Sequence, residues 1–282
     1  MSSRIARLSD IISHYDILLC DVWGVLHNGQ DPFVQADEAL AEARRDGLGV
    51  VLITNSPRLN DSVGRQLDRI GVSSRAYDRI VTSGDVTRRL VSELAGPIYF
   101  LGPDRDKALV DGLGVDCVGP EDARAVVCTG FFDDEKETPE DYRALLETLA
   151  KRNLPFICAN PDLVVERGHR LIPCAGAIAA LYQSLGGVTR IAGKPHQPIY
   201  EAAMIEAHAL RGPVDRRRVL AIGDGMPTDV KGAVEQDIDL LYVSAGIHGR
   251  EYMHDGRTDE AALARFLESH QVSPRWWMPR LA

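Results

Sequence analysis

Four short stretches of the chain place polar or charged side chains directly after apolar runs. In ILLCDVWGVLHNG, Asp21 ends such a run and precedes a turn that contains Gly24. The other stretches are VVLITNSPR with Thr54, Asn55 and Ser56, GKP with Lys194, and VLAIGDGMPTDV with Asp224 and Asp229. Taken alone, each has an ordinary structural explanation as a turn or a helix N-cap. Their chemistry depends on whether the fold brings them together.

Short apolar runs alternate with amphipathic helical patterns along the whole chain. Strands are predicted at 17–21, 49–54, 79–82, 98–102, 125–129, 155–159, 190–192, 219–223 and 240–244, and helices at 34–46, 61–70, 139–151, 197–210 and 259–269. This alternation predicts an α/β fold with a doubly wound, Rossmann-like parallel sheet. The runs are apolar throughout, so helices should cover both faces of the sheet.

The residues that could do chemistry fall into two blocks, 17–56 and 193–229. The long interval between the blocks has strands and helices of its own, so we expect an inserted second domain. The predicted core domain comprises residues 1–85 and 189–282, and the smaller α/β insert comprises residues 86–188. Functional residues collect at the carboxyl ends of parallel strands, so the four stretches should meet at one edge of the core sheet.

Composition argues against several classes of function. The chain has 282 residues, of which 45% are hydrophobic and 26% charged, as in ordinary soluble proteins. A formal net charge of −9 disfavours a nucleic-acid or anionic-membrane surface. No apolar run approaches the roughly 20 residues that cross a bilayer, and the N-terminus does not resemble a signal peptide. The five cysteines show no CxxC spacing, so we expect a cytoplasmic protein without a zinc site or disulfides.

The order and context of the four stretches resemble the haloacid dehalogenase (HAD) superfamily. Its members have a doubly wound core, a nucleophilic aspartate after the first strand, a Ser or Thr after the second, a lysine and a terminal acidic motif. TNSPR, GKP and an insert between the second and third motifs are similar to the type IIA branch, which contains sugar-, nucleotide-, pyridoxal- and glycolate-phosphate phosphatases. CANPDLV at 158–164 is similar to the Asn-Pro-Asp loop of its cap domains. The resemblance covers essentially the whole chain.

A divalent cation follows from the acidic residues. Asp21, Asp224 and Asp229 would repel one another at one sheet edge unless a cation lay among them. Ligation by carboxylate oxygens suits Mg²⁺, which also binds substrate phosphate. The resemblance implies that Asp21 and Asp224 bind Mg²⁺ directly, with the backbone carbonyl of Trp23 as a third ligand and Asp229 nearby or one layer further out.

The resemblance also implies covalent phosphoryl transfer. Asp21 would attack phosphorus and carry an aspartyl-phosphate intermediate. Thr54 and the backbone of Asn55 would donate to the phosphoryl oxygens, with Ser56 beside them. Lys194 would neutralise charge and orient Asp21. The substrate would be a small phosphorylated metabolite.

The predicted insert would contribute substrate specificity. Its candidate substrate-binding residues are Asn160 and Asp162, with Arg167 and His169 as weaker candidates. At its start, Ser83-Gly84-Asp85 is predicted to act as a hinge, because glycine permits backbone change. Near the C-terminus, the tryptophans of SPRWWMPRLA should pack on the core or its edge, or alternatively at a subunit contact of a homo-oligomer.

Trp23 departs from the Asp-x-Asp pattern that phosphatases of this superfamily usually have. The second Asp protonates the leaving alkoxide and then activates water, and losing such a group typically costs about 10²–10⁴ in rate. The indole N–H is only a donor and cannot replace it. His27 and Asp162 are the candidate surrogate acids. Activated leaving groups, such as aryl or acyl phosphates, need less protonation and should be the better substrates.

Two alternatives to a phosphatase stay open. One is a Mg²⁺- and phosphate-binding module whose catalytic step is impaired. The other is a 2-haloacid dehalogenase, since those enzymes carry an aromatic residue at the same offset and halide leaves without a proton. The intact acidic motif at 223–229 argues against the dehalogenase, which would not need it. We therefore rank the phosphatase first, the binding module second and the dehalogenase third.

Overall fold

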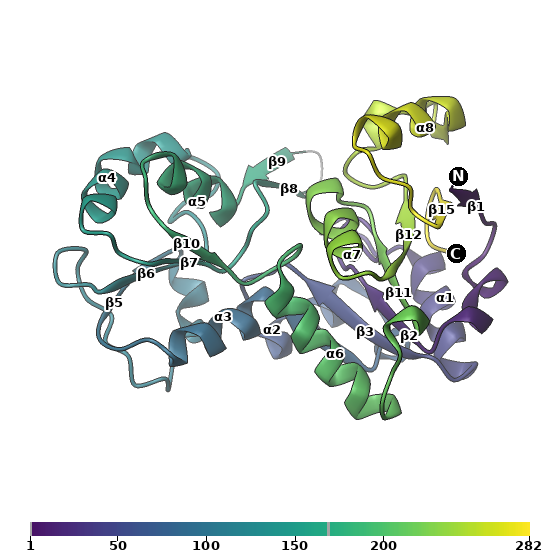
Figure 1. The fold of residues 1–282 in the computed structure, drawn as a ribbon, viewed down its shortest axis with the longest axis horizontal. Helices are drawn as coiled ribbons and strands as arrows, with labels where there is room; N and C mark the ends of the chain where they lie inside the picture. The colour runs from purple at the N-terminus through teal and green to yellow at the C-terminus, as the bar shows by residue number, and fades with distance from the viewer. Residues whose placement is uncertain (1, 168–169) are drawn as a thin grey trace. The chain divides into compact units, whose positions relative to one another are not determined.

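The computed structural model describes residues 2–167 and 170–282 (Figure 1). The chain forms two compact units. The first unit comprises Met1–Thr54, Gly64–Val81 and Tyr200–Ala282, and the second comprises Asn55–Val63 and Thr82–Ile199. None of the helices in the described part of the chain is long and apolar enough to span a membrane.

A seven-stranded sheet organises the first unit, with the strand order β1-β15-β12-β11-β2-β3-β4. The strands are β1 (Ser3–Arg4), β2 (Ile17–Cys20), β3 (Gly49–Thr54), β4 (Arg79–Thr82), β11 (Val219–Gly223), β12 (Asp239–Val243) and β15 (Trp276–Met278). Neighbours from β1 through to β3 pair in parallel. Every residue of β2, β3 and β11 is buried, which explains their uninterrupted apolar sequences.

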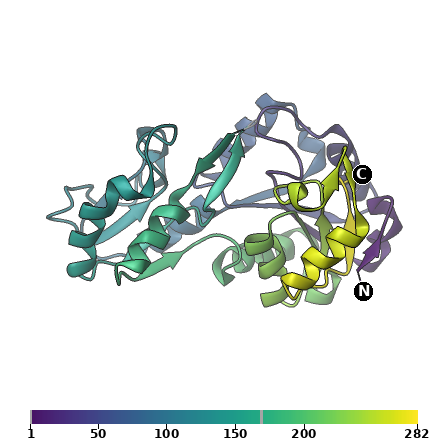
Figure 2. The same cartoon turned by 90° about the horizontal axis from the view of Figure 1, so that it is seen from above.

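Helices cover the first unit's sheet. They are α1 (Val34–Arg45), α2 (Asn60–Ile70), α6 (Gln197–Arg211), α7 (Lys231–Glu235) and α8 (Glu260–Ser269), and a short hairpin adds β13 (Met253–His254) and β14 (Arg257–Thr258). In α1 the buried residues Ala36, Ala39, Leu40 and Ala43 recur at helical spacing and give the helix one apolar face. α8 lies beside β15, near the end of the chain (Figures 1 and 2).

The second unit has a four-stranded parallel sheet with the order β10-β7-β6-β5. Its strands are β5 (Ile98–Leu101), β6 (Ala125–Cys128), β7 (Phe156–Cys158) and β10 (Thr189–Ile191), with an antiparallel hairpin of β8 (Val164–Arg167) and β9 (Arg170–Pro173). Its helices are α3 (Ser83–Ser92), α4 (Arg143–Lys151) and α5 (Ala175–Ser184). Val126 and Cys128 belong to one core cluster and Ala125 and Val127 to another, so both faces of this sheet are covered.

Short turns of other helix types connect these elements. The 3₁₀ segments are η1 (Leu8–Asp10), η2 (Ile12–His14), η3 (Ser74–Ala76), η4 (Asp104–Leu109), η5 (Pro139–Tyr142), η6 (Arg216–Arg218) and η8 (Gly249–Glu251), and η7 (Met226–Val230) is a π-helical turn. Among these turns, η7 carries Asp229 of the acidic motif at 223–229.

The predicted fold class is confirmed: the structure has parallel α/β sheets covered by helices, as in a HAD core that carries an inserted α/β segment. The predicted insert, residues 86–188, falls within the second unit, which extends further at both ends and includes residues 55–63. The functional boundary between core and cap stays a prediction. The sequence did not reveal α3, α5, the β8–β9 hairpin or β15.

The residues predicted as a hinge begin helix α3. Thr82 caps the helix, because its hydroxyl accepts a hydrogen bond from the Asp85 backbone N–H at 2.9 Å. A Cβ on Gly84 would overlap the carbonyl groups of Pro57 and Arg58, so this glycine permits close packing. A hinge motion here stays a prediction.

Candidate functional site

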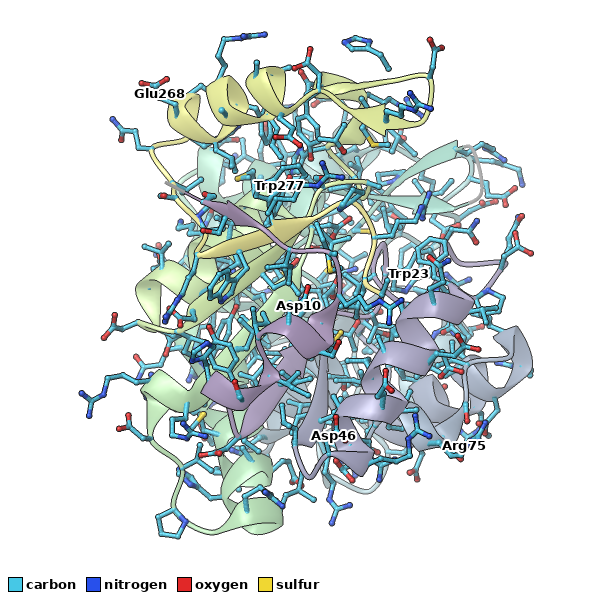
Figure 3. The ribbon with its side chains drawn as sticks, turned by 90° about the vertical axis from the view of Figure 1, so that its right-hand side faces the viewer. Asp10, Trp23, Asp46, Arg75, Glu268 and Trp277 are labelled. Carbon is cyan, nitrogen blue, oxygen red and sulfur yellow. The ribbon has the colours of Figure 1, made fainter. Side chains whose placement is uncertain are left out.

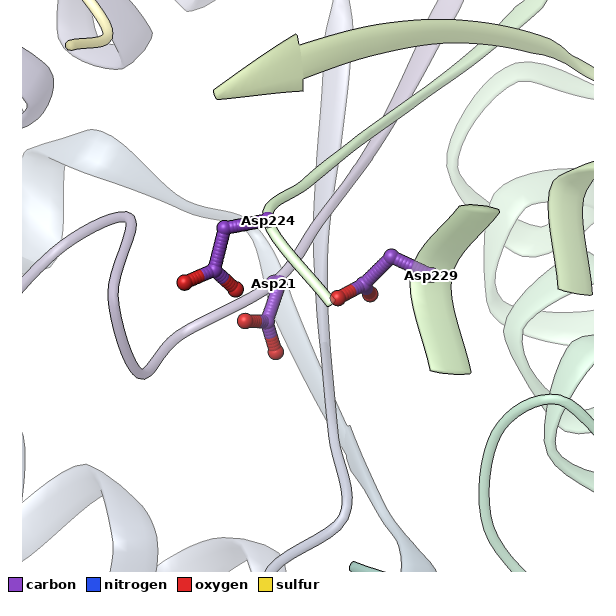
Figure 4. Close-up of side chains that lie close together, drawn as sticks. All are labelled: Asp21, Asp224 and Asp229. Atoms are coloured by element: carbon purple, nitrogen blue, oxygen red, sulfur yellow. The ribbon is translucent and has the colours of Figure 1, made fainter. Parts of the chain in front are cut away.

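Three buried carboxylates gather in the first unit (Figure 4). Asp21, Asp224 and Asp229 each contribute one oxygen to a group in which all three oxygens lie within 4.8 Å of one another. Strand order brings the first two together, because β2 and β11 are parallel neighbours with Cys20 opposite Ile222. The backbone N–H of Asp21 donates to the Ile222 carbonyl at 2.8 Å. The predicted convergence of these three residues is therefore observed.

The donor set fits a hard divalent cation. Three acidic side chains buried this close together repel one another unless positive charge or protons compensate them. Carboxylate oxygens are the preferred ligands of Mg²⁺ and Ca²⁺, at distances of about 2.0–2.6 Å. Among the described residues, this is the one group of acidic, histidine or cysteine side chains with such spacing.

Asp224 is held by two loops that approach it closely. Its Oδ2 accepts a hydrogen bond from the Ile247 backbone N–H at 2.7 Å. A Cβ on either Gly24 or Gly246 would overlap the Asp224 carboxylate. Gly24 also has a φ of +80°, a backbone conformation that favours glycine. The geometry of Asp224 therefore depends on glycine at both positions.

Sequence reasoning missed the loop after β12. Besides Ile247, this loop contains His248, whose Nε2 accepts a hydrogen bond from the Met226 backbone N–H at 3.1 Å. The loop therefore supports both Asp224 and the residue that opens η7. The sequence contains one signal for this loop. Gly246 closely follows the end of a predicted strand, as the other predicted site residues do.

Asp229 is oriented by its own loop. Its Oδ2 accepts hydrogen bonds from the Gly225 backbone N–H at 3.1 Å and from the Thr228 hydroxyl at 3.4 Å. A Cβ on Gly223 would overlap the Asp229 side chain. The π-helical turn Met226–Val230 carries this aspartate, and such turns are frequent at functional sites.

Trp23 packs on the turn that follows it. Its ring lies 4.9 Å from the His27 ring, edge to face, and a Cβ on Gly29 would overlap the indole. Figure 3 labels Trp23 in the loop region beside α1, well away from Trp277 beneath α8. The indole is only partly buried. The residue that replaces the second Asp is therefore part of a compact aromatic turn.

His27 is buried in this turn. Its side chain is only 1% exposed, and its Nδ1 accepts a hydrogen bond from the Gly29 backbone N–H at 2.9 Å. This bond leaves the proton of the neutral ring on Nε2. Burial lowers the pKa of His27 to about 4, so the ring is neutral at pH 7. A ring that gains its second proton only in acid has almost no protonated form at pH 7 that could act as a general acid, which weighs against His27 as the surrogate acid.

The remaining predicted site residues divide between the two units. Thr54 ends β3 in the first unit and is buried. In the second unit, the Asn55 side chain contacts both Lys194 and Asp162. Asn55 and Lys194 are 5% and 2% exposed, respectively.

The other predicted residues of the second unit have local partners. The Ser56 hydroxyl accepts a hydrogen bond from the Arg58 backbone N–H at 3.3 Å. Oδ1 of Asn160 accepts one from the Asp162 backbone N–H at 3.0 Å. The Arg167 side chain and His169 lie outside the residues that the structure describes.

Comparison with known proteins agrees with this architecture. Residues 18–116 match the sequence profile of the haloacid dehalogenase-like hydrolases, and residues 191–269 match a HAD-hydrolase-like profile. A solved haloacid dehalogenase-like hydrolase from Brucella suis 1330 is 51% identical, with a TM-score of 0.88 over 98% of this chain and 99% of that one.

Two further similar proteins are named as phosphatases. The acid sugar phosphatase of Staphylococcus aureus (strain USA300) is 27% identical over 84% of this chain and 89% of its own length. Glycerol phosphate phosphatase Rv1692 from Mycobacterium tuberculosis, solved in complex with magnesium, is 26% identical with a TM-score of 0.66, over 84% of this chain and 70% of that one.

The chain therefore belongs to the haloacid dehalogenase-like hydrolases. Within that family, its motifs and its inserted α/β segment place it in the capped type IIA branch, and it is an enzyme of the hydrolase class.

Proposed function

We propose that the protein is a Mg²⁺-dependent phosphatase that hydrolyses a small phosphorylated metabolite. The observation that carries the proposal is the buried cluster of Asp21, Asp224 and Asp229 at the carboxyl ends of β2 and β11. The relatives named as sugar and glycerol phosphate phosphatases support it and make sugar and polyol phosphates the first substrates to test. A cytoplasmic location and a homo-oligomeric state stay predictions.

The metal would be held by oxygens from the first unit. Asp21 and Asp224 would bind Mg²⁺ directly, with the backbone carbonyl of Trp23, and Asp229 would stand nearby or one layer further out. When bound, Mg²⁺ would neutralise part of the charge of the three carboxylates and of the substrate phosphate.

In the proposed reaction, Asp21 acts as the nucleophile. One carboxylate oxygen attacks phosphorus, the bond from phosphorus to the leaving oxygen breaks, and an aspartyl-phosphate remains on Asp21. Water then attacks phosphorus, the bond between phosphorus and the Asp21 oxygen breaks, and inorganic phosphate leaves the regenerated carboxylate. Thr54, the Asn55 backbone and Ser56 donate hydrogen bonds to the phosphoryl oxygens, and Lys194 offsets their charge. Asn160 and Asp162 contribute to substrate selection.

Trp23 determines which leaving groups the enzyme tolerates. No carboxyl group stands two residues after Asp21 to protonate the leaving oxygen. Aryl and acyl phosphates, whose leaving groups are stable as anions, should therefore be hydrolysed faster than alkyl phosphates. The same substitution supports the second candidate function, an impaired module that binds Mg²⁺ and phosphate without useful turnover.

The test is a screen of aryl phosphates, alkyl phosphates and 2-haloacids, with Mg²⁺ and with EDTA, for the wild type and Asp21→Asn. We expect Mg²⁺-dependent phosphate release that is fastest for aryl phosphates and falls at least about 10³-fold in Asp21→Asn. Phosphate release that is unchanged by the substitution would contradict the enzymatic proposal and leave the binding module. Release of halide that survives EDTA, without hydrolysis of aryl phosphates, would favour the dehalogenase.

A further inference from the structure

The side-chain amide of Asn55 joins two loops of the second unit. Its Oδ1 accepts a hydrogen bond from the Lys194 backbone N–H at 2.7 Å, and its Nδ2 lies 3.4 Å from the Lys194 carbonyl oxygen. The same Nδ2 donates to Oδ1 of Asp162 at 2.8 Å. A carboxylate is a strong acceptor for such a donor. A continuous set of contacts therefore runs from Asp162 through Asn55 to the backbone of Lys194.

The loop that carries Asp162 is fixed from its own side. Oδ1 of Asn160 accepts from the Asp162 backbone N–H at 3.0 Å, and the Cys158 thiol donates to the Asn160 carbonyl at 3.2 Å. A Cβ on Gly176, in the first turn of α5, would overlap the carbonyl oxygens of Pro161 and Asp162. Packing and hydrogen bonds thus hold the backbone of the loop from which the Asp162 carboxylate extends.

Gly193 lets the two loops approach each other. A Cβ at this position would overlap both Oδ1 of Asn55 and the ring of Pro161. Gly193 immediately precedes Lys194 in the GKP motif. The glycine of this motif is therefore required by the same packing that places the Lys194 backbone against Asn55.

We infer that Asp162 is a positioning residue: it orients the Asn55 amide, which in turn fixes the backbone of Lys194. The inference rests on the proposed function for the role of Lys194 in catalysis. In this role Asp162 orients the Asn55 amide and does not act as the surrogate general acid. The Asn55 side chain fixes the Lys194 backbone, whereas its backbone N–H is proposed to bind the phosphoryl group.

The two roles of Asp162 make different demands on its side chain. A general acid must carry an exchangeable proton to the leaving group, which an amide cannot do. A positioning residue must offer an acceptor oxygen to Nδ2 of Asn55, and an asparagine at position 162 would still offer one. Asp162→Asn therefore separates the roles, whereas Asp162→Ala removes both.

The experiment measures kcat and KM for one aryl and one alkyl phosphate in Asp162→Asn, Asp162→Ala and the control Asp104→Ala, whose carboxylate is 91% exposed in the same unit. We expect Asp162→Asn to keep the wild-type ratio of aryl to alkyl phosphate hydrolysis, and Asp162→Ala to lose about 10- to 100-fold in kcat on both substrates. Loss of alkyl phosphate hydrolysis in Asp162→Asn, with aryl hydrolysis retained, would identify an acid and overturn the inference.

A measurement without substrate separates this inference from the proposed function. We expect hydrogen exchange at the Lys194 backbone N–H to accelerate in Asp162→Ala but not in Asp162→Asn or Asp104→Ala, with thermal unfolding as a control for global stability. Equal protection of Lys194 in Asp162→Ala and the wild type would overturn the positioning role, even if the protein proved to be a phosphatase. Absence of phosphatase activity would leave this readout intact.

Discussion

The carboxylate cluster of the first unit and the amide network of the second unit are built in opposite ways. Asp21, Asp224 and Asp229 bring like charges together. The Asn55 amide instead pairs a donor with an acceptor at each contact, to Asp162 and to the Lys194 backbone. The first arrangement gathers like charges in a way that fits a cation, whereas the second matches donors with acceptors.

We expect the carboxylate cluster to bind a ligand, and the side-chain contacts of Asn55 to hold the local backbone. A cluster that repels itself costs stability and persists where a ligand compensates it. A satisfied polar network instead makes the local backbone rigid. The predictions below address the carboxylate cluster first and then compare it with the network.

The largest effect should come from restoring the missing acid beside the cluster. In Trp23→Asp, a carboxyl group again stands two residues after Asp21. We expect kcat for alkyl phosphates to rise by about 10²-fold or more, with a smaller gain for aryl phosphates, because only the alkyl leaving group depends strongly on protonation. Steady-state hydrolysis of one alkyl and one aryl phosphate measures this increase in kcat.

Trp23→Asn is the matched control, since it removes the indole equally but adds no acid. Equal rates in Trp23→Asp and Trp23→Asn would show that lack of an acid does not limit this enzyme. The same conclusion would follow if Trp23→Asp raised kcat equally for the alkyl and the aryl phosphate.

The next effect concerns the glycine that clears space for Asp224. The Cβ of Gly246→Ala would overlap the Asp224 carboxylate, so this ligand must move. We expect Mg²⁺ affinity, measured by calorimetry, to fall about 10- to 100-fold, as for other groups that support metal ligands. Gly64→Ala is the control, because the nearest atom to its Cβ would lie at an ordinary 3.7 Å. Unchanged affinity in Gly246→Ala would contradict the role given to Asp224.

A third prediction compares the two regions directly. If only the cluster binds the cation, Mg²⁺ should stabilise the wild type against unfolding by about 2.7 kcal/mol at one hundred times its dissociation constant. Asp224→Asn should lose this gain and Asp162→Asn should keep it. Thermal unfolding with and without Mg²⁺ measures the three proteins. Loss of the Mg²⁺-dependent stabilisation in Asp162→Asn would show that cation binding also depends on Asp162, and it would contradict binding by the cluster alone.

The smallest effect concerns Asp106, one of four buried side chains in the described part of the second unit that have an atom without a hydrogen-bond partner. Its Oδ1 is buried without a hydrogen-bond partner among the described residues, and the Nε of Arg58 lies 4.0 Å away. Burial raises the pKa of Asp106 above its usual 3.8. The folded state therefore disfavours the carboxylate, and its stability falls as pH rises through the raised pKa.

Asp106→Asn removes that charge and should stabilise the protein at pH 7 by about 1 kcal/mol. The gain should vanish in acid, once the wild-type carboxyl is protonated in both the folded and the unfolded state. Asp104→Asn, exposed in the same 3₁₀ segment, should change little. Denaturant unfolding at neutral and acidic pH compares them. A gain that does not depend on pH would exclude the charge as its cause.

The sequence predicted the cluster but not what supports it. Asp21 and Asp224 were found because each follows an apolar run, and runs buried on both sheet faces are recognisable from composition alone. The strands Gly49–Thr54, Arg79–Thr82 and Val219–Gly223 occur with the predicted bounds.

The missed features depend on long-range packing. Gly246 contacts Asp224 only because β12 lies next to β11, a strand order that sequence spacing does not give. The direction of the Asn55 amide depends on loops more than one hundred residues apart along the chain. β15 is a three-residue strand between β1 and β12 that ends before a proline, and it is too short to show a pattern.

The most direct test of the central claim is whether Asp21 takes up the phosphoryl group. Wild-type enzyme turning over an aryl phosphate with Mg²⁺ would be quenched in acid, and the intact protein and its peptides weighed by mass spectrometry. Because no second aspartate activates water, we predict that one phosphoryl group accumulates on Asp21 and that EDTA or Asp21→Asn abolishes it. Phosphate release at full rate with no adduct, or an adduct on another residue, would contradict the account.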